Sequence, residues 1–365
     1  MRYVADRTHI PVPQIRAFRL NTSEDRSTTP FVILEKPSGV PLDTVIFSLS
    51  PFEQNAIVAQ MARWTLEIFK HRFDAIGSLF MDEAGDYRVG PLARRPFYVD
   101  GRAKLALDRG PFRTAKAYYT ACAQREMDCS RVLFVQDAPP TYQRDLEDTR
   151  LTVERIVGLM CDLTDQCQGL DDGDPEVAPF SLDIHDIGLK DIYVSSANRS
   201  QITSIIDWQF TCVRPLWCCA RLPAWLRPSL SEGNEVTARL SAIFRAEVAR
   251  IEGAQPIFLR SLDSDDTRSV LDELSDYDAF RDGFLLLPAL ENILATLPGH
   301  EDVAGLTALL DPATLPGRVA RISLLTRGSN TMYLAMTPPR SNLDLLVGED
   351  GMEILPPLGN KVTVL

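Results

Sequence analysis

The stretch FSLDIHDIGLKDIYV, Phe180 to Val194, is followed a few residues later by ITSIIDWQF, Ile202 to Phe210. Both contain short apolar runs with β-branched residues, which are typical of buried strands. Three acids stand at the ends of these runs: Asp186, Asp191 and Asp207. A carboxylate at the rim of a core is costly to bury without a partner. We therefore expect each acid to meet a cation, a hydrogen-bond donor or a metal ion.

The two stretches are expected to pair as short strands joined by a turn near Ala197 and Asn198. Such a hairpin brings Asp191 and Asp207 together, and two carboxylates suit Mg²⁺, a hard ion that also binds substrate phosphates. Asp186 lies five residues before Asp191 and could accept a proton from a substrate hydroxyl. The alternative is structural, because aspartates are also common in turns and at helix caps.

Local signals elsewhere predict the order of the elements. Ser50 is a good N-cap, Pro51 suits the first helical position and Glu53 completes a capping box, so a helix should begin here. A β-hairpin is expected around Ala84 and Gly85, and a β-rich run at 29–42. Further helices are expected near residues 114–135, 148–170, 234–251 and 264–297. The strands and helices are segregated along the chain, which favours an α+β fold over an alternating βαβ sheet.

Composition excludes some functions. The chain has 365 residues, 45% of them apolar, and a formal charge of −12. An acidic chain is a poor binder of nucleic acid, because that binding depends on Lys and Arg at phosphates. No apolar run is long enough to span a membrane, and the first residues have no signal-peptide character, so a cytoplasmic location is expected. The seven cysteines include no C-x-x-C pair, and most of them are expected to be reduced core residues.

A resemblance rests on the spacing of these acids. IHDIGLKDIYV followed by SIIDWQF resembles the catalytic loop and metal-binding motif of the aminoglycoside phosphotransferase family, in particular its fungal phosphotransferase-like branch. The stretches IPVPQI, FVILEKPSGVPL and RPLWCCARLPAWL resemble the same branch. The resemblance covers roughly residues 1–226. It implies a protein-kinase-like fold with a mainly helical C-lobe, and phosphoryl transfer from ATP with Mg²⁺ to the hydroxyl of a small molecule.

The resemblance also implies roles for individual residues. Asp186 matches the catalytic base, while Asp191 and Asp207 match the metal ligands. The hinge that would bind the adenine ring is matched by Leu34, Glu35, Lys36 and Pro37. Three parts are expected: an N-lobe remnant with the hinge at 1–45, the C-lobe with the catalytic motifs at 46–335, and a C-terminal tail at 336–365.

The chain departs from the family pattern at several positions. Ile184 stands where the family has a histidine, His185 is adjacent instead, and Asp191 replaces an asparagine. The residues before Leu34 contain no lysine and no glycine, so the phosphate-covering loop and the nucleotide-binding Lys of a kinase N-lobe are missing. Pro37 has no N–H for the adenine. The N-lobe is therefore expected to be incomplete, as if truncated.

Two functions remain open at this point. The first is an ATP/Mg²⁺-dependent phosphotransferase whose activity is impaired by the missing N-lobe parts. The second is a non-catalytic, pseudokinase-like binding protein or a truncated fragment. Asp183 could attract a cationic acceptor or be a solvated loop charge, and Arg214 could pair with a carboxylate at the core edge or touch an anionic ligand. The sequence names neither the acceptor substrate nor the oligomeric state.

Overall fold

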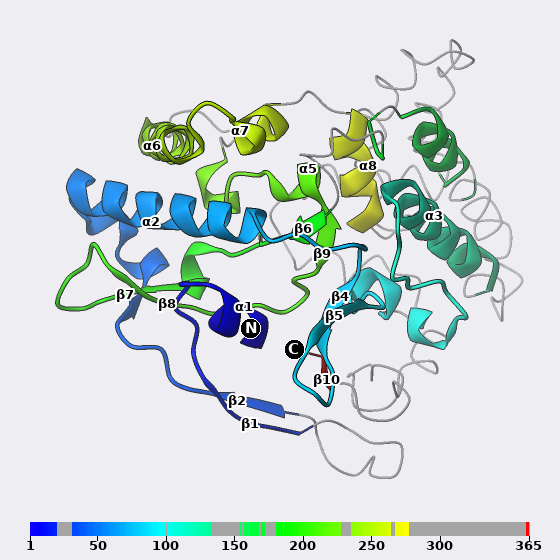
Figure 1. Cartoon of the computed structure of the whole chain (residues 1–365), viewed down its shortest axis with the longest axis horizontal. Helices are drawn as coiled ribbons and strands as arrows, with labels where there is room; N and C mark the ends of the chain where they lie inside the picture. Colours follow the sequence, from blue (N-terminus) through cyan, green and yellow to red (C-terminus); the bar gives the residue numbers. More distant parts are fainter. Residues whose placement is uncertain are drawn as a thin grey trace, which may run out of the picture. The chain divides into compact units, whose positions relative to one another are not determined.

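The computed structural model describes residues 1–19, 31–99, 101–132, 154, 157–167, 169–171, 180–184, 186–227, 235–263, 267–276 and 363–364 (Figure 1). Helices and short strands occur together within these ranges, which confirms the α+β class. None of the helices in this described part combines the length and the apolar composition that crossing a bilayer requires. The predicted tail at 336–365 lies outside the described residues except for its last strand.

The α-helices include those predicted near 114–135 and 234–251 and shorter ones that the sequence did not indicate. The helices predicted at 148–170 and 264–297 are present where the structure describes them, and the rest of each lies outside the described residues. The α-helices are α1 (Arg2–Arg7), α2 (Pro51–Phe69), α3 (Ala115–Val132), α5 (Leu216–Cys219), α6 (Glu235–Glu252), α7 (Ile257–Leu262) and α8 (Thr267–Asp276). Residues 157–166 are also helical. Short 3₁₀ turns add η1 (Leu42–Thr44), η2 (Ile46–Ser48), η3 (Arg95–Phe97), η4 (Arg102–Lys104), η6 (Leu189–Asp191) and η7 (Ala224–Leu226).

The strands are short and form four small sheets of two or three strands each within the described residues. They are β1 (Ile15–Arg19), β2 (Phe31–Leu34), β3 (Val40–Pro41), β4 (Ser78–Met81), β5 (Tyr87–Gly90), β6 (Phe180–Leu182), β7 (Ile192–Val194), β8 (Ile202–Ile205), β9 (Val213–Pro215) and β10 (Thr363–Val364). The sheet orders are β1-β2, β10-β4-β5, β3-β7-β8 and β6-β9, and every pair is antiparallel. The β4–β5 pair is the hairpin predicted around Gly85.

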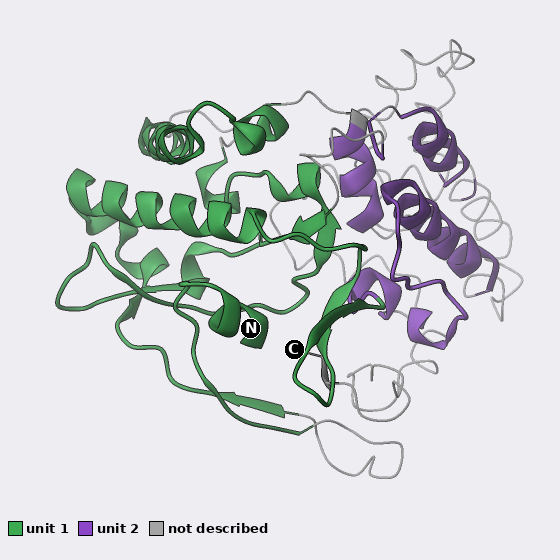
Figure 2. Cartoon of the chain, viewed as in Figure 1, with its two compact units in different colours: residues 1–91, 173–264, 357–365 green, residues 92–172, 265–356 purple. Residues whose placement is uncertain are grey.

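The chain forms two compact units that are interleaved in sequence (Figure 2). Unit 1 contains residues 1–91, 173–264 and 357–365, and unit 2 contains residues 92–172 and 265–356. All three acids of the opening stretches belong to unit 1. The boundaries expected at residues 45 and 335 stay predictions.

The core of unit 1 is built around helix α2. The helix starts as predicted, because the Ser50 hydroxyl accepts the Glu53 N–H while the Glu53 carboxylate accepts the Ser50 N–H. Its apolar face packs with α5, α6 and α7, where the Phe69 and Phe258 rings meet edge to face at 5.0 Å. The core cluster consists of Val58, Ala62, Leu66, Phe69, Leu216, Cys219, Ala220, Leu222, Leu226, Leu240, Phe244, Val248 and Phe258. This packing gives β6 and β9 a rigid base, since the Ser181 hydroxyl donates to the Ile68 carbonyl.

Unit 2 holds a buried polar cluster instead of a purely apolar interior. The carboxylate of Glu126 on α3 accepts from Arg102 at 3.0 Å and from Arg125 at 2.6 Å, and all three side chains are buried. Arg125 also donates to the Ser275 carbonyl of α8 and lies over the ring of Phe97. A carboxylate shared by two buried guanidinium groups offsets part of the cost of burying their charges. The cluster therefore connects η3, η4, α3 and α8.

Candidate functional site

The hairpin predicted from the opening stretches is present. Strands β7 and β8 pair antiparallel, with Ile192 opposite Ile205, and β3 extends the sheet by pairing with β7. Directly beyond this pair, the Ile206 N–H donates to the Asp191 carbonyl at 2.8 Å. The backbone of Asp191 is thus tied to the residue that precedes Asp207. The structure brings these two acids to the same end of the hairpin.

Asp191 is the buried member of the group, with 4% of its surface exposed. Its carboxylate accepts the Gly188 N–H at 3.0 Å, which fixes its direction. Burial raises the pKa of Asp191 above its ordinary value, and the negative charges of Asp207 and Asp186 raise it further. The charges of Asp207 and Asp186 therefore both act on the Asp191 carboxylate, and a cation placed beside Asp191 would relieve this repulsion.

Asp207 is exposed and has an uncommon backbone conformation. Its φ angle is +61°, in the left-handed region that non-glycine residues seldom adopt, although aspartate tolerates it better than most. Phe210, three residues later, also has a φ of +61°. Between them, Trp208 is buried and its indole N–H donates to the Ile205 carbonyl at 2.8 Å. The buried indole holds the segment in place, and Asp207 beside it is exposed.

Asp186 lies exposed in the turn between β6 and η6, and His185 beside it lies outside the described residues. Among the described residues, no three His, Cys, Asp or Glu side chains are arranged as a complete ligand set for a metal ion. Mg²⁺ does not require such a set, because it keeps several waters and uses one or two carboxylates plus substrate phosphates. The Asp191 and Asp207 carboxylates fit that mode of binding.

The predicted hinge is an exposed connection between β2 and β3. The Glu35 N–H already donates to the Gln14 carbonyl at 2.8 Å, and the Glu35 carboxylate pairs with Arg16 at 3.1 Å. Pro37 has no N–H. Leu34 and Lys36 are exposed, as are the other side chains of β2. An adenine ring bound here would have few free backbone groups left for hydrogen bonds. The hinge residues therefore fit a nucleotide poorly, whereas the Asp191 and Asp207 carboxylates fit a metal ion.

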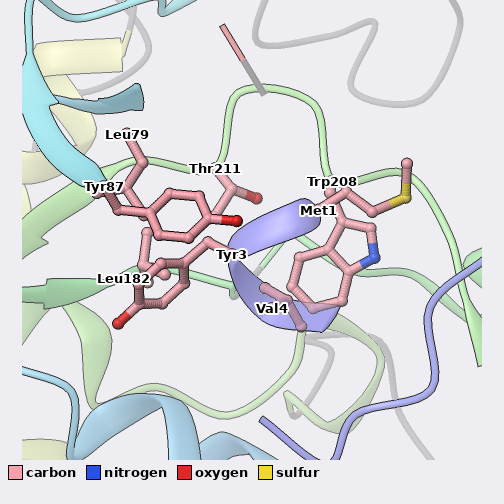
Figure 3. A pocket seen from close by; sticks show the side chains of 8 residues that line it. All are labelled: Met1, Tyr3, Val4, Leu79, Tyr87, Leu182, Trp208 and Thr211. Carbon is pink, nitrogen blue, oxygen red and sulfur yellow. The ribbon is translucent and has the colours of Figure 1, made fainter. Parts of the chain in front are cut away.

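Helix α1 lies against the segment that follows Asp207. Met1, Tyr3 and Val4 line a small hollow together with Trp208 and Thr211 (Figure 3). Leu79, Tyr87 and Leu182 complete its wall. The rings of Tyr3 and Tyr87 meet edge to face at 5.1 Å, and the hollow has a volume of about 20 Å³, enough for about one water molecule. It is a packing defect beside the acids and too small for a substrate.

Asp183 and Arg214 form a buried ion pair directly beside the acid-bearing loop. The Arg214 Nη1 atom donates to the Asp183 Oδ2 atom at 3.0 Å, with 1% and 4% of the two side chains exposed. The sequence left two alternatives open for each residue. The structure selects the structural pairing for Arg214 and shows that Asp183 is not a solvated loop charge. The sequence did contain one signal for this pair: Arg214 is the single charged residue in the apolar run VRPLWCC, and an arginine buried there requires an acidic partner.

The other sequence-based expectations concern single side chains. No disulfide joins any of the seven cysteines, which all lie in the described residues, and five of them are buried. His9 pairs with Glu67, and His71 accepts or donates a hydrogen bond with the Tyr3 hydroxyl at 2.6 Å. Both histidines are therefore packing or surface residues.

Comparisons with known proteins give limited guidance. No protein-family model matches the chain. The chain is similar to two curated proteins of Aspergillus fumigatus, from strains CBS 144.89 and Af293, both described as subtelomeric hrmA-associated cluster proteins. Each is 25% identical over 299 residues, covering 66% of this chain and 58% of the relative. The chain thus spans less than two thirds of the length of these relatives, and their descriptions state no activity.

Proposed function

We propose that the chain has a protein-kinase-like fold of the aminoglycoside phosphotransferase type and transfers a phosphoryl group from ATP to the hydroxyl of a small molecule. The observation that carries the proposal is the placement of Asp191 and Asp207. They lie at one end of the β7–β8 hairpin, joined by the Ile206 hydrogen bond, and Asp207 has a strained φ of +61°. Backbone strain of this kind clusters at functional sites.

Each acid has a role in this proposal. Asp191 and Asp207 would hold Mg²⁺, which, when bound, neutralises charge on the phosphates. Asp186, exposed in the preceding turn, would accept the proton of the acceptor hydroxyl. Phosphoryl transfer depends mainly on positioning and charge neutralisation, and the Asp191 carboxylate, which a backbone hydrogen bond from Gly188 holds at 3.0 Å, is suited to it.

A second candidate is a non-catalytic binding protein of the same fold. The state of the hinge favours it, because the Glu35 N–H is already bonded, Pro37 has no N–H and no lysine precedes Lys36. Such a protein would bind a divalent cation or another ligand at the acids without turning over ATP. Both candidates share the carboxylate site and differ in nucleotide binding.

Calorimetric titration of the purified chain with ATP in the presence of Mg²⁺ separates the two candidates. We expect saturable binding that is lost in Asp207→Ala and kept in Asp82→Ala, which removes a turn carboxylate of the β4–β5 hairpin. Equal binding by the wild type and Asp207→Ala would exclude the metal role of Asp207. A folded wild-type chain that binds Mn²⁺ but no ATP would favour the non-catalytic candidate.

A further inference from the structure

We infer that the buried ion pair of Asp183 and Arg214 is a positioning device that fixes where Asp186 is presented. The role of Asp186 itself rests on the proposed function. The positioning rests on the geometry of the segment between β6 and β9 and can be tested without any turnover. Asp183 and Arg214 touch no reacting atom in this account, so they are positioning residues.

The pair stands at the point where the acid-bearing loop leaves the sheet. Ser181 of β6 lies opposite Arg214 of β9, and the Asp183 N–H extends this pairing by donating to the Cys212 carbonyl at 3.0 Å. Asp186 follows only three residues later. An ion pair at Asp183 therefore sets the direction in which the loop begins.

The same loop is held at its other end by Asp191. The Asp191 N–H donates to the Gly188 carbonyl at 3.1 Å, its carboxylate accepts the Gly188 N–H, and its carbonyl accepts from Ile206. From Ile206 the chain continues through Asp207 back to Arg214. The chain from Asp183 to Arg214 thus forms a closed path. The ion pair joins its two ends, and the hydrogen bonds of Asp191 join its middle.

All three carboxylates lie on this closed path, and the turn that carries Asp186 is closed by a long hydrogen bond, from the Ile187 N–H to the Ile184 carbonyl at 3.5 Å. Asp186 is exposed, whereas Asp191 is buried and Asp207 follows a bonded residue. If the ion pair is lost, the start of the loop loses its directional contact while the Asp191 end stays fastened. The expected consequence is a change in the position of Asp186 relative to Asp207.

Stability alone gives no reason to use an ion pair at this place. Apolar residues of similar volume often replace a buried pair with no loss of stability, whereas removal of one partner is strongly destabilising. What the guanidinium adds is a planar group with fixed hydrogen-bond directions. A double variant, Asp183→Leu with Arg214→Met, therefore removes the directional hydrogen bond and keeps about the same side-chain volume. Arg214→Lys keeps the charge and removes the planar group.

Hydrogen–deuterium exchange of the ligand-free chain tests the positioning directly. In the double variant we expect the amides at the start of the loop, Asp183 N–H on the Cys212 carbonyl and Ile187 N–H on the Ile184 carbonyl, to exchange about ten times faster or more. The amides of Gly188 and Asp191, at the end that stays held, and those of α2 should be unchanged. Arg214→Lys should give the same pattern and covers the case in which the double variant fails to fold. Arg102→Met, which removes a buried guanidinium from unit 2, is the control and should leave the loop unchanged.

Two exchange results would overturn the inference: a loop that exchanges as in the wild type, or an equal increase throughout unit 1. If the wild type turns over ATP, the folded variants should lose about tenfold or more in kcat with the KM for Mg·ATP within about threefold, because Asp186 acts on the acceptor. A rise of about tenfold in the KM for Mg·ATP with an unchanged kcat would also overturn the inference. If the wild type has no turnover, the proposed function fails and exchange alone decides the positioning.

Discussion

Replacing Gly39 by alanine should disturb the connection between β2 and β3 strongly. Gly39 precedes β3 and has a φ of +95°, and a Cβ built there would overlap the carbonyl oxygen of Val194 and lie 2.8 Å from its carbon. The left-handed backbone costs an alanine about 1–2 kcal/mol, and forcing an extra methyl group into filled space typically costs about 1–3 kcal/mol. Gly39→Ala should therefore lower the free energy of unfolding of unit 1 by about 2–5 kcal/mol.

Gly85→Ala is the matched control. Gly85 has a similar φ of +89°, but a Cβ there meets nothing within 4 Å, so only the backbone cost of about 1–2 kcal/mol should remain. The four tryptophans, Trp64, Trp208, Trp217 and Trp225, all lie in unit 1, so urea unfolding followed by tryptophan fluorescence reports on this unit. Equal losses in the two variants would refute the packing of the hinge against β7.

Three further outcomes are expected. Glu126→Gln removes the carboxylate shared by Arg102 and Arg125, so calorimetric unfolding should show a loss of about 3–5 kcal/mol, and a loss below about 1 kcal/mol would contradict the buried cluster. Ser50→Ala removes the α2 cap and should cost about 1 kcal/mol in urea unfolding, with no loss if the capping box contributes nothing. Asp191→Asn should raise the melting temperature of the metal-free chain at pH 7, because the raised pKa of Asp191 means that its charged form opposes folding there. The higher melting temperature of Asp191→Asn should disappear as the pH falls through the pKa of Asp191. If the variant is less stable than the wild type at pH 7, burial and the neighbouring acids do not oppose the charged form of Asp191.

The sequence predicted the elements that local signals specify. The start of α2 could be predicted because Ser50, Pro51 and Glu53 act on backbone groups a few residues away. The β7–β8 hairpin could be predicted because two apolar runs are separated by a short polar turn, and with it the proximity of Asp191 and Asp207. These pairings need little loop closure and depend on few distant contacts.

What the sequence left undetermined depends on residues far apart in the chain. The β6–β9 pairing joins Ser181 to Arg214, and nothing near either residue indicates the other. The choice between the two roles of Asp183 followed only once that pairing was known. Tertiary packing decided these features.

Mn²⁺ binding, measured by electron paramagnetic resonance, shows whether the gathered acids hold a divalent cation. We predict saturable binding to the wild type that weakens at least about tenfold in Asp191→Ala and in Asp207→Ala. Binding should also weaken as the pH falls, since protons compete for Asp191 above the ordinary range of an aspartate. Wild-type binding that both variants retain, or no binding by a folded wild-type chain, would contradict the account.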